Sequence, residues 1–471
     1  MFYLGKRIAR DQTLEVRSPY DGALIDSVAE FQKEDIAPIL ATARKGAELM
    51  RNMSAGERAA ILERAAERLA HNEEIAQLLC LEVGKHIREA RMEVYRAAGT
   101  LRAAATAART LSGETIPMDL LNLSNKIAFY QRVPVGIVLA ITPFNFPINL
   151  ACHKVGPAIA GGNAILLKPA TKTPLATMKY AQMLIECGLP PEAITVVVGR
   201  GGALIEELVA HPDIRKISFT GSPEVGERLV RLGGLKKVTT ELGSNAAVIV
   251  DEGIDPREAA RRIAAGAFGC CGQICISIQR VFAHKSICSE LIAHLVEEAK
   301  TRKMGNPMDE ANTNGCMISE SAAARAVSWV KEAERAGATV HCGGTKEGSV
   351  MQATVLSNVS SDSKLMLDEV FAPAVFVNAF SDLSDAIAMV NRSPYGLQNA
   401  LFSTQLNHIM QCIGEIESGA LLINESPTFR ADNMPYGGMK RSGIGREGPE
   451  FAVQEMTEIK LVVIDSWNSQ T

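Results

Sequence analysis

The feature that most constrains the fold is a series of short, mostly apolar runs that alternate with longer amphipathic stretches. The runs are VGIVLAI (135–141), AILLKP (164–169), ITVVVG (194–199), KISFT (216–220) and AAVIV (246–250). The stretches between them, such as PLATMKYAQMLIECG and GALIEELVAH, have helical spacing. Strands that are apolar along their length are buried on both faces, and alternation with helices is typical of βαβ units. The sequence therefore predicts an α/β fold with a parallel sheet covered by helices on both sides.

The flanking regions extend this pattern. From Lys33 to about Ala108 the residue spacing predicts a series of helices. After Asp251 we expect a second α/β region, with helices in DPREAARRIAAGAF and CSELIAHLVEEAKTRK and strands near VFVNAF and GALLIN. No Gly/Ser linker separates the two regions, so they should pack tightly. The apolar tail strand EIKLVVID (458–465) needs a partner edge, within the chain or on a neighbouring subunit.

Composition excludes several classes of protein. The 471 residues carry 49 Lys and Arg against 53 Asp and Glu, so nucleic acid is not an expected partner. The ten cysteines form no CxxC pair and the N-terminus lacks the apolar core of a signal peptide, which predicts reduced thiols and a cytoplasmic location. The apolar run 135–152 contains prolines and asparagines, so no membrane span is expected. No metal site is predicted.

Three residues have side chains suited to catalysis. Cys275 lies in FGCCGQICIS, a loop that would leave a thiol partly exposed, as a nucleophilic cysteine requires. Glu241 follows the strand-like KKVTT, and Asn145 is bracketed by two prolines that could hold its amide as a rigid donor. Local context leaves structural alternatives open: a packed thiol, a carboxylate held by local amides, and a turn asparagine. Cys270 and Cys271 fit the role of packed hydrophobic side chains better, and a role for either as a resolving cysteine is left open.

The local signals for a cofactor are also ambiguous. No GxGxxG follows the first candidate strand, so the usual dinucleotide fingerprint is absent. FTGSPEVG (219–226) instead places Gly221 and Ser222 at the start of a helix, where backbone amides could face a pyrophosphate. Alternatively, Ser222 is an ordinary helix N-cap. Lys168 ends the run ILLKPA, at a sheet edge where ligands bind, although a surface lysine has the same pattern.

The order of the motifs is more specific than any one of them. TPFNFP, ILLKPA, FTGSPEVG, ELGSN, GQIC, DEVFAP and MPYGGMKRSGIGREG follow one another along the chain. Together they resemble the aldehyde dehydrogenase superfamily over essentially the whole sequence, with separations similar to those of its non-acylating, hydrolytic branch. The resemblance implies a Rossmann-type cofactor domain, an α/β catalytic domain and a small β extension for oligomerisation.

The resemblance implies a covalent mechanism. Cys275 would attack the aldehyde carbon to form a thiohemiacetal, with the oxyanion held by the Asn145 side-chain amide and the Cys275 backbone amide. Glu241 matches the general base and would activate the water that hydrolyses the thioester. Its presence argues against the CoA-acylating branch. The presence of all three residues argues against a catalytically idle ligand-binding or structural relative.

The resemblance also implies a cofactor site. Lys168 matches the residue that holds the adenosine ribose, and Gly221 with Ser222 matches the pyrophosphate turn. Glu369 with Phe371 matches the residues that contact the nicotinamide ribose and ring. Where NAD-preferring members commonly have an acidic residue, this chain has Thr171, followed by Lys172. We therefore expect NADP to be accepted, with NAD still usable.

The subgroup resembled most contains the lactaldehyde, non-phosphorylating glyceraldehyde-3-phosphate and phosphonoacetaldehyde dehydrogenases, judged from GQICISIQR and FRADNMPYGG. Arg96 and Arg430 match or lie near arginines that bind an anionic substrate group, and a guanidinium fork suits such a group. Phe146, Ile274 and Phe429 would instead line an apolar funnel. The hypothesis is a short oxygenated or anionic aldehyde, and the alternative is an uncharged aliphatic one.

The resemblance further predicts how the chain is divided. Residues 1–108 with 132–243 would form the cofactor domain and residues 244–446 the catalytic domain. Residues 109–131 with 447–471 would form the oligomerisation extension, which agrees with the apolar tail strand. We expect a homo-oligomer, either a dimer or a tetramer, that acts on a small aldehyde.

Overall fold

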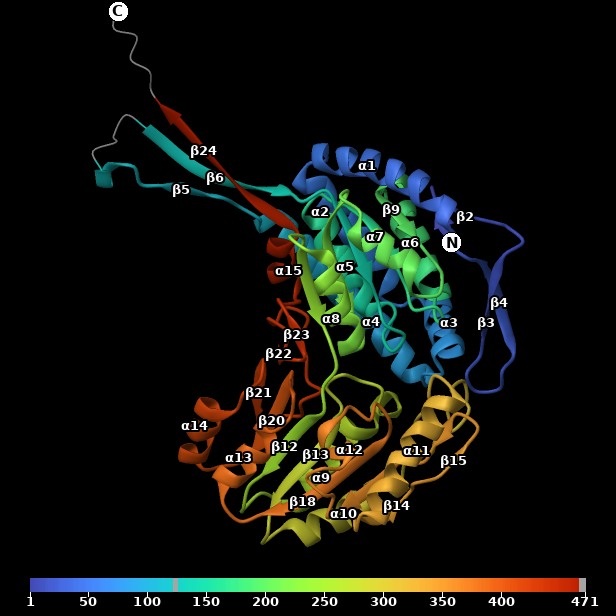
Figure 1. Ribbon diagram of the computed structural model, residues 1–471, viewed down its shortest axis with the longest axis vertical. Coiled ribbons are helices and arrows are strands. Elements are labelled where there is room, and N and C mark those ends of the chain that lie inside the picture. Colours follow the sequence, from blue (N-terminus) through green and yellow to red (C-terminus); the bar gives the residue numbers. More distant parts are fainter. Residues whose placement is uncertain (122–125, 466–471) are drawn as a thin grey trace, which may run out of the picture.

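The computed structural model describes residues 1–121 and 126–465, which form two α/β bodies and a projecting ribbon (Figure 1). The upper body in that view contains an eight-stranded sheet, the lower body a seven-stranded sheet and the ribbon three strands. Within the described ranges, no helix has both the length and the apolar character needed to cross a membrane, and no cluster of three or more His, Cys, Asp and Glu side chains could hold a metal ion.

The eight-stranded sheet has a parallel core whose strand order changes direction at β7. Its order is β2-β1-β9-β8-β7-β10-β11-β23, so β8 and β9 extend it on one side of β7, and β10 and β11 on the other. The carboxyl ends of β7 and β10 therefore flank a switch point, where open α/β sheets bind ligands. The strands are β1 Phe2–Tyr3, β2 Lys6–Arg7, β7 Ile137–Ile141, β8 Ala164–Lys168, β9 Ile194–Val196, β10 Ile214–Thr220, β11 Lys237–Glu241 and β23 Gly443–Ile444.

Helices cover both faces of this sheet, as the apolar runs predicted. In β7, Val138 and Ala140 belong to one hydrophobic core, formed with α2 to α6, whereas Ile137 and Leu139 belong to another, formed with α1, α7 and α8. The predicted helical region after Lys33 is confirmed as α1 to α4. The helices are α1 Ile36–Asn52, α2 Ala55–Leu69, α3 Glu73–Val83, α4 Ile87–Thr110, α5 Asn149–Ala160, α6 Leu175–Glu186, α7 Ala203–Ala210 and α8 Pro223–Gly233, with short 3-10 turns at Lys33–Asp35, Asp119–Leu121 and Pro191–Ala193.

The second α/β region is also confirmed. Its sheet has the order β14-β17-β18-β13-β12-β20-β21 and is parallel except at the edge strand β14. Helices α9 and α10 pack on one face, and α11 to α14 on the other. The elements are β12 Ala246–Val250, β13 Ile278–His284, β14 Thr339–Cys342, β17 Thr354–Ser357, β18 Ala374–Phe380, β20 Gln398–Phe402, β21 Ala420–Ile423, α9 Pro256–Phe268, α10 Cys288–Lys300, α11 Glu320–Arg335, α12 Lys364–Leu367, α13 Leu383–Asn391 and α14 Leu406–Glu415, with a 3-10 turn at Gly269–Gly272.

The segment after the second sheet runs back onto the first. β23 pairs antiparallel with β11, and the Leu242 backbone N–H donates to the Ser442 carbonyl at 2.9 Å. Helix α15 (Pro449–Glu455) then packs beside α4 and α5. This return brings the MPYGGMKRSGIGREG motif between the two bodies. Sequence reasoning did not predict β1 to β4 before residue 33. The remaining strand pairs are β3 Thr13–Arg17 with β4 Leu24–Ala29, β15 Lys346–Glu347 with β16 Val350–Met351, and β19 Tyr395–Gly396 with β22 Met439–Lys440.

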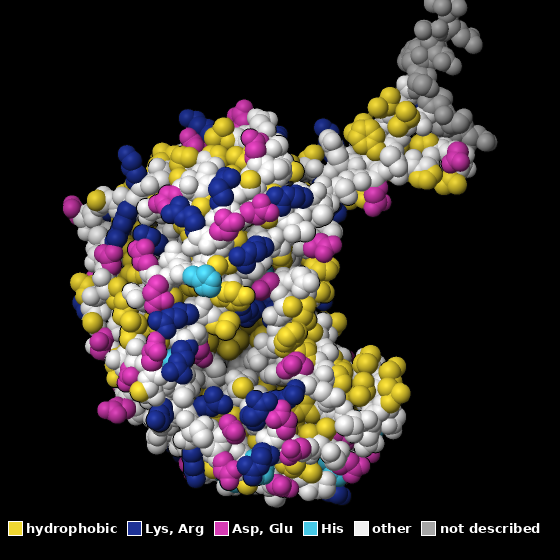
Figure 2. Space-filling model, turned by 180° about the vertical axis from the view of Figure 1, so that it is seen from behind, with side chains coloured by type: hydrophobic (Ala, Val, Ile, Leu, Met, Phe, Trp, Pro, Cys, Tyr) yellow, Lys and Arg dark blue, Asp and Glu magenta, His cyan; other side chains and the backbone are white. Residues whose placement is uncertain are grey.

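The projecting ribbon contains the predicted tail strand. β24 (Thr457–Asp465) pairs antiparallel along its length with β6 (Lys126–Pro134), and β5 (Glu114–Ile116) adds a third strand. The partner edge of the tail strand is thus within the chain. Ile459, Leu461 and Val463 are each more than half exposed, and hydrophobic side chains gather on the ribbon in Figure 2. An exposed apolar ribbon of this kind marks a surface suited to another protein.

Candidate functional site

Cys275 lies on a tightly constrained loop between α9 and β13. Cys270, Cys271 and Gly272 have φ values of 48°, 54° and 68°, three successive left-handed residues. A Cβ on Gly272 would collide with the carbonyl oxygen of Ala372. The glycine of GQIC is therefore required, because it lets the thiol loop approach the DEVFAP segment closely.

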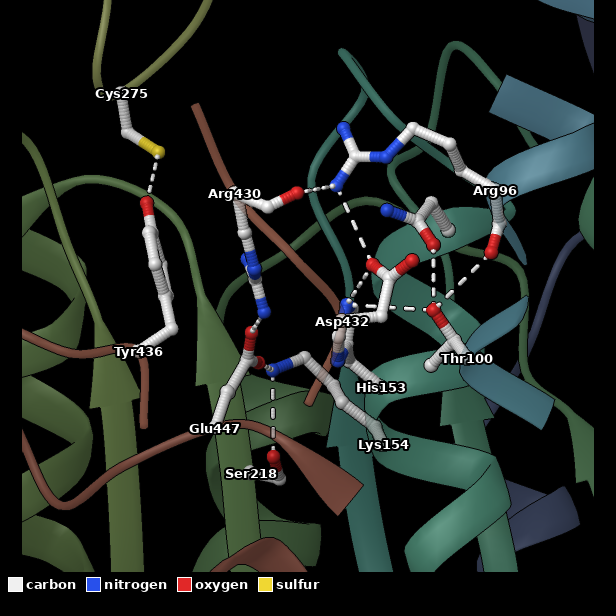
Figure 3. Close-up of polar contacts among 11 residues, drawn as sticks. Arg96, Thr100, His153, Lys154, Ser218, Cys275, Arg430, Asp432, Tyr436 and Glu447 are labelled. Atoms are coloured by element: carbon white, nitrogen blue, oxygen red, sulfur yellow. Dashed lines mark hydrogen bonds and ion pairs between the residues drawn. The ribbon is translucent and has the colours of Figure 1, made fainter. Parts of the chain in front are cut away.

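The thiol of Cys275 is mostly enclosed and has one polar side chain beside it. Its Sγ lies 3.0 Å from the Tyr436 hydroxyl (Figure 3), and the surrounding apolar side chains are Ile274, Ile276 and Leu397. Burial raises the pKa of Cys275 to about 12, against the lowering effect of the Tyr436 hydrogen bond. The thiol is partly exposed, as the loop sequence allowed, and the charge of Arg430 is a further influence that lowers its pKa. The thiol is protonated at neutral pH and needs a partner to ionise.

The Asn145 amide is directed at the same loop. Its Nδ2 donates to the carbonyl oxygen of Gln273 at 2.7 Å, and the residue is buried. One N–H of the amide is used in this bond, which leaves the second for another acceptor. The Asn145 amide thus bonds to the residue two positions before the nucleophile, and its part in holding an oxyanion stays a prediction.

Glu241 ends β11 with its carboxylate in a closed space. Both of its oxygens are buried and lack a hydrogen-bond partner among the described residues. A Cβ on Gly437 would lie 3.0 Å from Oε1, so the glycines after Tyr436 make room for this carboxylate. Burial, and next the charge of Glu447, raise the pKa of Glu241 well above its usual 4.5. Local amides do not hold this carboxylate, so that alternative reading is wrong.

A buried ion cluster lies beside these groups (Figure 3). Glu447 accepts from Lys154 at 2.8 Å and from Arg430 at 3.1 Å, and Lys154 also donates to Ser218 at 3.3 Å. The Arg430 guanidinium stacks on the Tyr436 ring, 3.7 Å from its centroid. Burial by itself would raise the pKa of Glu447, but Lys154 and Arg430 lower it to about 2. The pKa values of the two carboxyl groups, Glu241 and Glu447, are thus shifted in opposite directions.

Sequence reasoning missed Tyr436, Glu447 and Lys154. The first two lie inside MPYGGMKRSGIGREG, a motif whose interior was not assigned. Lys154 is fully buried in the apolar helix α5, and a lysine among apolar residues was the available signal.

The two arginines expected to bind an anionic substrate group are already engaged. Arg430 is buried and paired with Glu447, although its Nε has no partner among the described residues. Arg96 donates to the Arg430 carbonyl at 3.1 Å and to Asp432 at 3.3 Å. Glu447 and Asp432 therefore occupy part of each guanidinium fork, and binding of an anionic substrate group by Arg96 and Arg430 stays a prediction. Asp432 also contacts His153 at 3.3 Å, and burial lowers the pKa of this histidine to about 4.

The apolar residues expected around the substrate are only partly gathered together. Ile274 packs in the cluster around Cys275. Phe146 is half-buried and carries the Lys85 ammonium 3.6 Å above its ring, while Phe429 is 50% exposed. Lys85 itself is buried in an ion pair with Glu93. The wall next to the thiol is apolar, and more distant walls are polar and charged.

Lys168 and Thr171, the positions predicted for the adenosine end of the cofactor, lie at and just after the end of β8. The Lys168 ammonium donates to the Pro169 carbonyl at 3.0 Å, and burial lowers its pKa to about 8. The Thr171 hydroxyl donates to the Gly199 carbonyl at 2.8 Å. Thr171 also lines a cavity of about 670 Å³ whose walls carry the cationic side chains Arg17, Lys172 and Arg200. This donor set fits a ligand bearing phosphate.

The predicted pyrophosphate turn has a clear structural role. The Gly221 backbone N–H donates to the Glu241 carbonyl at 3.1 Å, so it is already engaged. The Ser222 hydroxyl accepts from the Val225 N–H at 3.5 Å and caps α8, with Pro223 at the first helical position. The N-cap reading is confirmed, and a part for the remaining helix-end donors in phosphate binding stays a prediction.

On the nicotinamide side, Glu369 and Phe371 lie against the thiol loop. Glu369 is half-buried and accepts from the Ser244 N–H at 3.0 Å, and desolvation of its carboxyl raises its pKa to about 8. Phe371 has a left-handed φ of 51°, and its ring meets that of Phe144 edge to face, 5.8 Å between centroids. A small cavity lies between these residues and Ile274. The positions predicted for the nicotinamide end of the cofactor thus share a cavity with Gly272 and Ile274 of the thiol loop.

Comparisons with known proteins agree with this arrangement. The aldehyde dehydrogenase family matches residues 7–462. A 3-sulfolactaldehyde dehydrogenase of Priestia aryabhattai is 42% identical over 456 residues, covering 96% of this chain and 95% of that protein. A lactaldehyde dehydrogenase of Methanococcus aeolicus is 36% identical over 471 residues, covering 99% and 100%. The crystal structure of glyceraldehyde-3-phosphate dehydrogenase GapN from Methanocaldococcus jannaschii, complexed with NADP, superposes with a TM-score of 0.93 at 35% identity, covering 97% of this chain and 100% of that one.

Proposed function

The chain belongs to the aldehyde dehydrogenase family, and from that premise we propose that it oxidises a short oxygenated or anionic aldehyde to the free acid through a Cys275 thioester. It is an NAD(P)-dependent aldehyde dehydrogenase of the non-acylating type. The observation that carries the mechanism is the convergence of three groups. The Asn145 amide donates to the carbonyl of Gln273, two residues before Cys275, and the charge of Glu241, whose carboxylate has no hydrogen-bond partner among the described residues, acts on the Cys275 thiol.

In the acylation step, the Cys275 sulfur attacks the aldehyde carbon. The oxygen that becomes negative is held by the second Asn145 N–H and the Cys275 backbone N–H, donors that are in place before the reaction begins. When bound, NADP or NAD supplies the acceptor for the hydride that leaves this carbon. Glu369 and Phe371 line a small cavity with Ile274, the residue before the nucleophile, and would hold the nicotinamide end of the cofactor.

In the deacylation step, Glu241 removes a proton from the water that attacks the thioester. Its closed environment raises its pKa, which makes the carboxylate a stronger base once it is ionised. Glu447, held ionised by Lys154 and Arg430, adds to the negative field that raises the proton affinity of Glu241.

The choice of cofactor follows from the cavity beside Thr171. A 2′-phosphate would meet Lys172, Arg200 and Arg17 there, and no acidic side chain stands at position 171 to repel it. Glu15 and Glu320 also border this cavity, so its lining has three positive and two negative side chains. We infer that NADP is preferred over NAD and that NAD still functions.

The substrate class follows from the charges around the thiol. Arg96, Arg430 and Lys154 supply three positive charges, and Asp432 and Glu447 supply two negative ones. With His153 held neutral by burial, these five residues carry one more positive charge than negative ones. An anionic or hydroxylated aldehyde suits that field better than a hydrocarbon tail does. The named relatives act on sulfolactaldehyde and lactaldehyde, which supports the same class.

The proposal includes the organisation of the chain. The cofactor would bind to residues 1–108 with 132–243, catalysis would depend on residues 244–446, and residues 109–131 with 447–471 would join subunits of a dimer or tetramer. The ten cysteines carry no disulfide, which suits the reducing cytoplasm.

The test is to follow reduction of NADP and NAD with 3-sulfolactaldehyde, lactaldehyde, glyceraldehyde 3-phosphate, phosphonoacetaldehyde, succinate semialdehyde and hexanal. We expect the highest kcat/KM with an anionic or 2-hydroxy aldehyde and no requirement for CoA. Cys275→Ala should abolish the reaction, whereas Cys342→Ala, which removes a half-buried thiol elsewhere, should not. A clear preference for hexanal would establish the aliphatic alternative, and the absence of any reduction would indicate an idle relative.

A further inference from the structure

Tyr436 is held in one position from several sides. Its backbone N–H donates to the Glu447 carbonyl at 3.0 Å, and the Glu447 N–H donates back to the Tyr436 carbonyl at 2.6 Å. The side chain is buried, and its ring lies under the Arg430 guanidinium, which is itself fixed by Glu447. The position of the hydroxyl is therefore fixed by the backbone hydrogen bonds of Tyr436 and by the packing of its ring.

That hydroxyl is directed at the nucleophile. Figure 3 shows the Tyr436 hydroxyl directed at the Cys275 sulfur, with 3.0 Å between the two atoms. Among the described residues, no other side chain hydrogen-bonds to this sulfur, whose remaining contacts are with Ile274, Ile276 and other apolar groups. A thiolate in such apolar surroundings is strongly disfavoured without a donor.

We propose that Tyr436 is a catalytic residue whose phenol donates a hydrogen bond to the Cys275 sulfur and stabilises its thiolate before it attacks the aldehyde. The S–H bond breaks, its electron pair stays on sulfur, and the proton passes to water. Tyr436 keeps its own proton, because burial holds the pKa of the phenol well above 10. When the sulfur attacks, the same electron pair becomes the S–C bond, and the hydrogen bond from the phenol is released. This inference rests on the proposed function in one respect, namely that Cys275 is the nucleophile.

Arg430 strengthens the donor. A cation over the face of an aromatic ring draws on its electron density, which makes the phenolic O–H more polar. A hydrogen bond to a charged group is also stronger than one between neutral groups. The charge that forms on sulfur is therefore stabilised by a short chain of contacts, from the Cys275 sulfur through Tyr436 to Arg430, and on to Glu447.

The test measures alkylation of Cys275 by iodoacetamide in the free enzyme, which needs neither aldehyde nor cofactor. Tyr436→Phe should lower the second-order rate constant about 10-fold or more at mildly alkaline pH, because the donor to the thiolate is lost. Replacing Tyr436 by 3-fluorotyrosine, which is similar in shape and a stronger donor, should make alkylation faster than in the wild type. Tyr180→Phe removes a hydroxyl from another fully buried tyrosine, on α6, and should leave the rate unchanged. Mass spectrometry identifies the alkylated peptide as that of Cys275.

An alkylation rate that rises from Tyr436→Phe through the wild type to the 3-fluorotyrosine variant supports the inference. An unchanged rate in Tyr436→Phe overturns it, and so does a slower Phe variant without a faster fluorotyrosine variant, since that pattern indicates a space-filling role. If no aldehyde is oxidised and the alkylation order still holds, the proposed function fails while the hydrogen bond to the sulfur stands.

Discussion

At the scale of single residues, the site depends on carboxyl groups whose pKa values are shifted away from their usual range. Glu241 and Glu447 are both fully enclosed, yet one has a raised pKa and the other a pKa of about 2. The difference comes from their partners, since Lys154 and Arg430 contact Glu447 and no described residue hydrogen-bonds to the Glu241 carboxylate. A carboxylate without partners costs stability, and such a cost is found where a base must be reactive.

Replacing Glu241 by Gln should separate the two chemical steps. We expect a burst of about one reduced cofactor per active site, followed by turnover that is slower by roughly 10²–10⁴ because the general base is missing. In the wild type, protonated Glu241 cannot accept a proton, so kcat should rise with pH through a pKa well above 4.5. Stopped-flow measurement of cofactor reduction across pH tests both statements. A missing burst, or a wild-type rise in kcat that persists unchanged in Glu241→Gln, would contradict the assignment.

The cofactor preference should reverse when a negative charge is placed at position 171. In Thr171→Glu, repulsion of a 2′-phosphate should lower kcat/KM for NADP by roughly 100-fold relative to that for NAD. Thr171→Gln has the same length without the charge and is the matched control. Steady-state kinetics with both cofactors gives the ratio, and equal losses for NADP and NAD would show that position 171 does not face the phosphate.

At the scale of elements, the nucleophile loop is shaped by backbone conformation. Three successive left-handed residues, Cys270 to Gly272, turn the chain sharply, and the Cys270 N–H is anchored by Glu89 at 2.6 Å. Left-handed cysteines are costly, so neighbouring contacts must hold them there. The neighbouring segment at Ala372 is close enough to exclude any side chain on Gly272.

Gly272→Ala should therefore damage both stability and catalysis. The left-handed φ and the collision with the Ala372 carbonyl together should cost about 2–5 kcal/mol of the free energy of unfolding. The control is Gly253→Ala, where φ is 78° but a Cβ would have open space, so only about 1–2 kcal/mol is expected. Chemical denaturation compares the two. Equal destabilisation would show that the contact with Ala372 adds nothing.

At the scale of the whole molecule, the ribbon is an apolar surface that a single chain leaves exposed to solvent. β24 and β6 extend away from both bodies with large apolar side chains in the open (Figures 1 and 2). A second apolar stripe lies on α14, where Leu406, Met410 and Ile413 are exposed. Exposed apolar surface of this extent is expected to be covered by another copy of the chain.

Adding negative charges to the ribbon by substitution should lower the mass of the oligomer in solution. We expect Leu461→Asp with Val463→Asp to shift the protein from a dimer or tetramer to smaller species, because burying the added charges in an interface is unfavourable. Lys460→Glu, an exposed change on the same strand, is the control for added negative charge. Light scattering gives the mass against the 50.6 kDa of one chain. An unchanged mass would place the subunit interface elsewhere.

Much of this could be predicted from the sequence, because the deciding signals are local. Apolar runs placed β7, β8, β10 and β12 within a few residues of their observed bounds. The short strands β1 and β2 were not predicted, since two-residue strands carry no periodic pattern and form only because β9 offers an edge. The motifs likewise identified Cys275, Asn145 and Glu241, since residue type and order along the chain are enough to select them.

By itself, then, the sequence determined the α/β class, the family and the candidate reactive residues. The tertiary structure alone decided their partners and protonation states. Nothing along the chain indicates that Glu447 would engage Arg430, that Asp432 would engage Arg96, or that Tyr436 would meet the Cys275 sulfur. These pairs join segments up to several hundred residues apart. Pairing and burial are properties of three-dimensional proximity, and they set pKa values and free donors far more strongly than the neighbouring residues in sequence do.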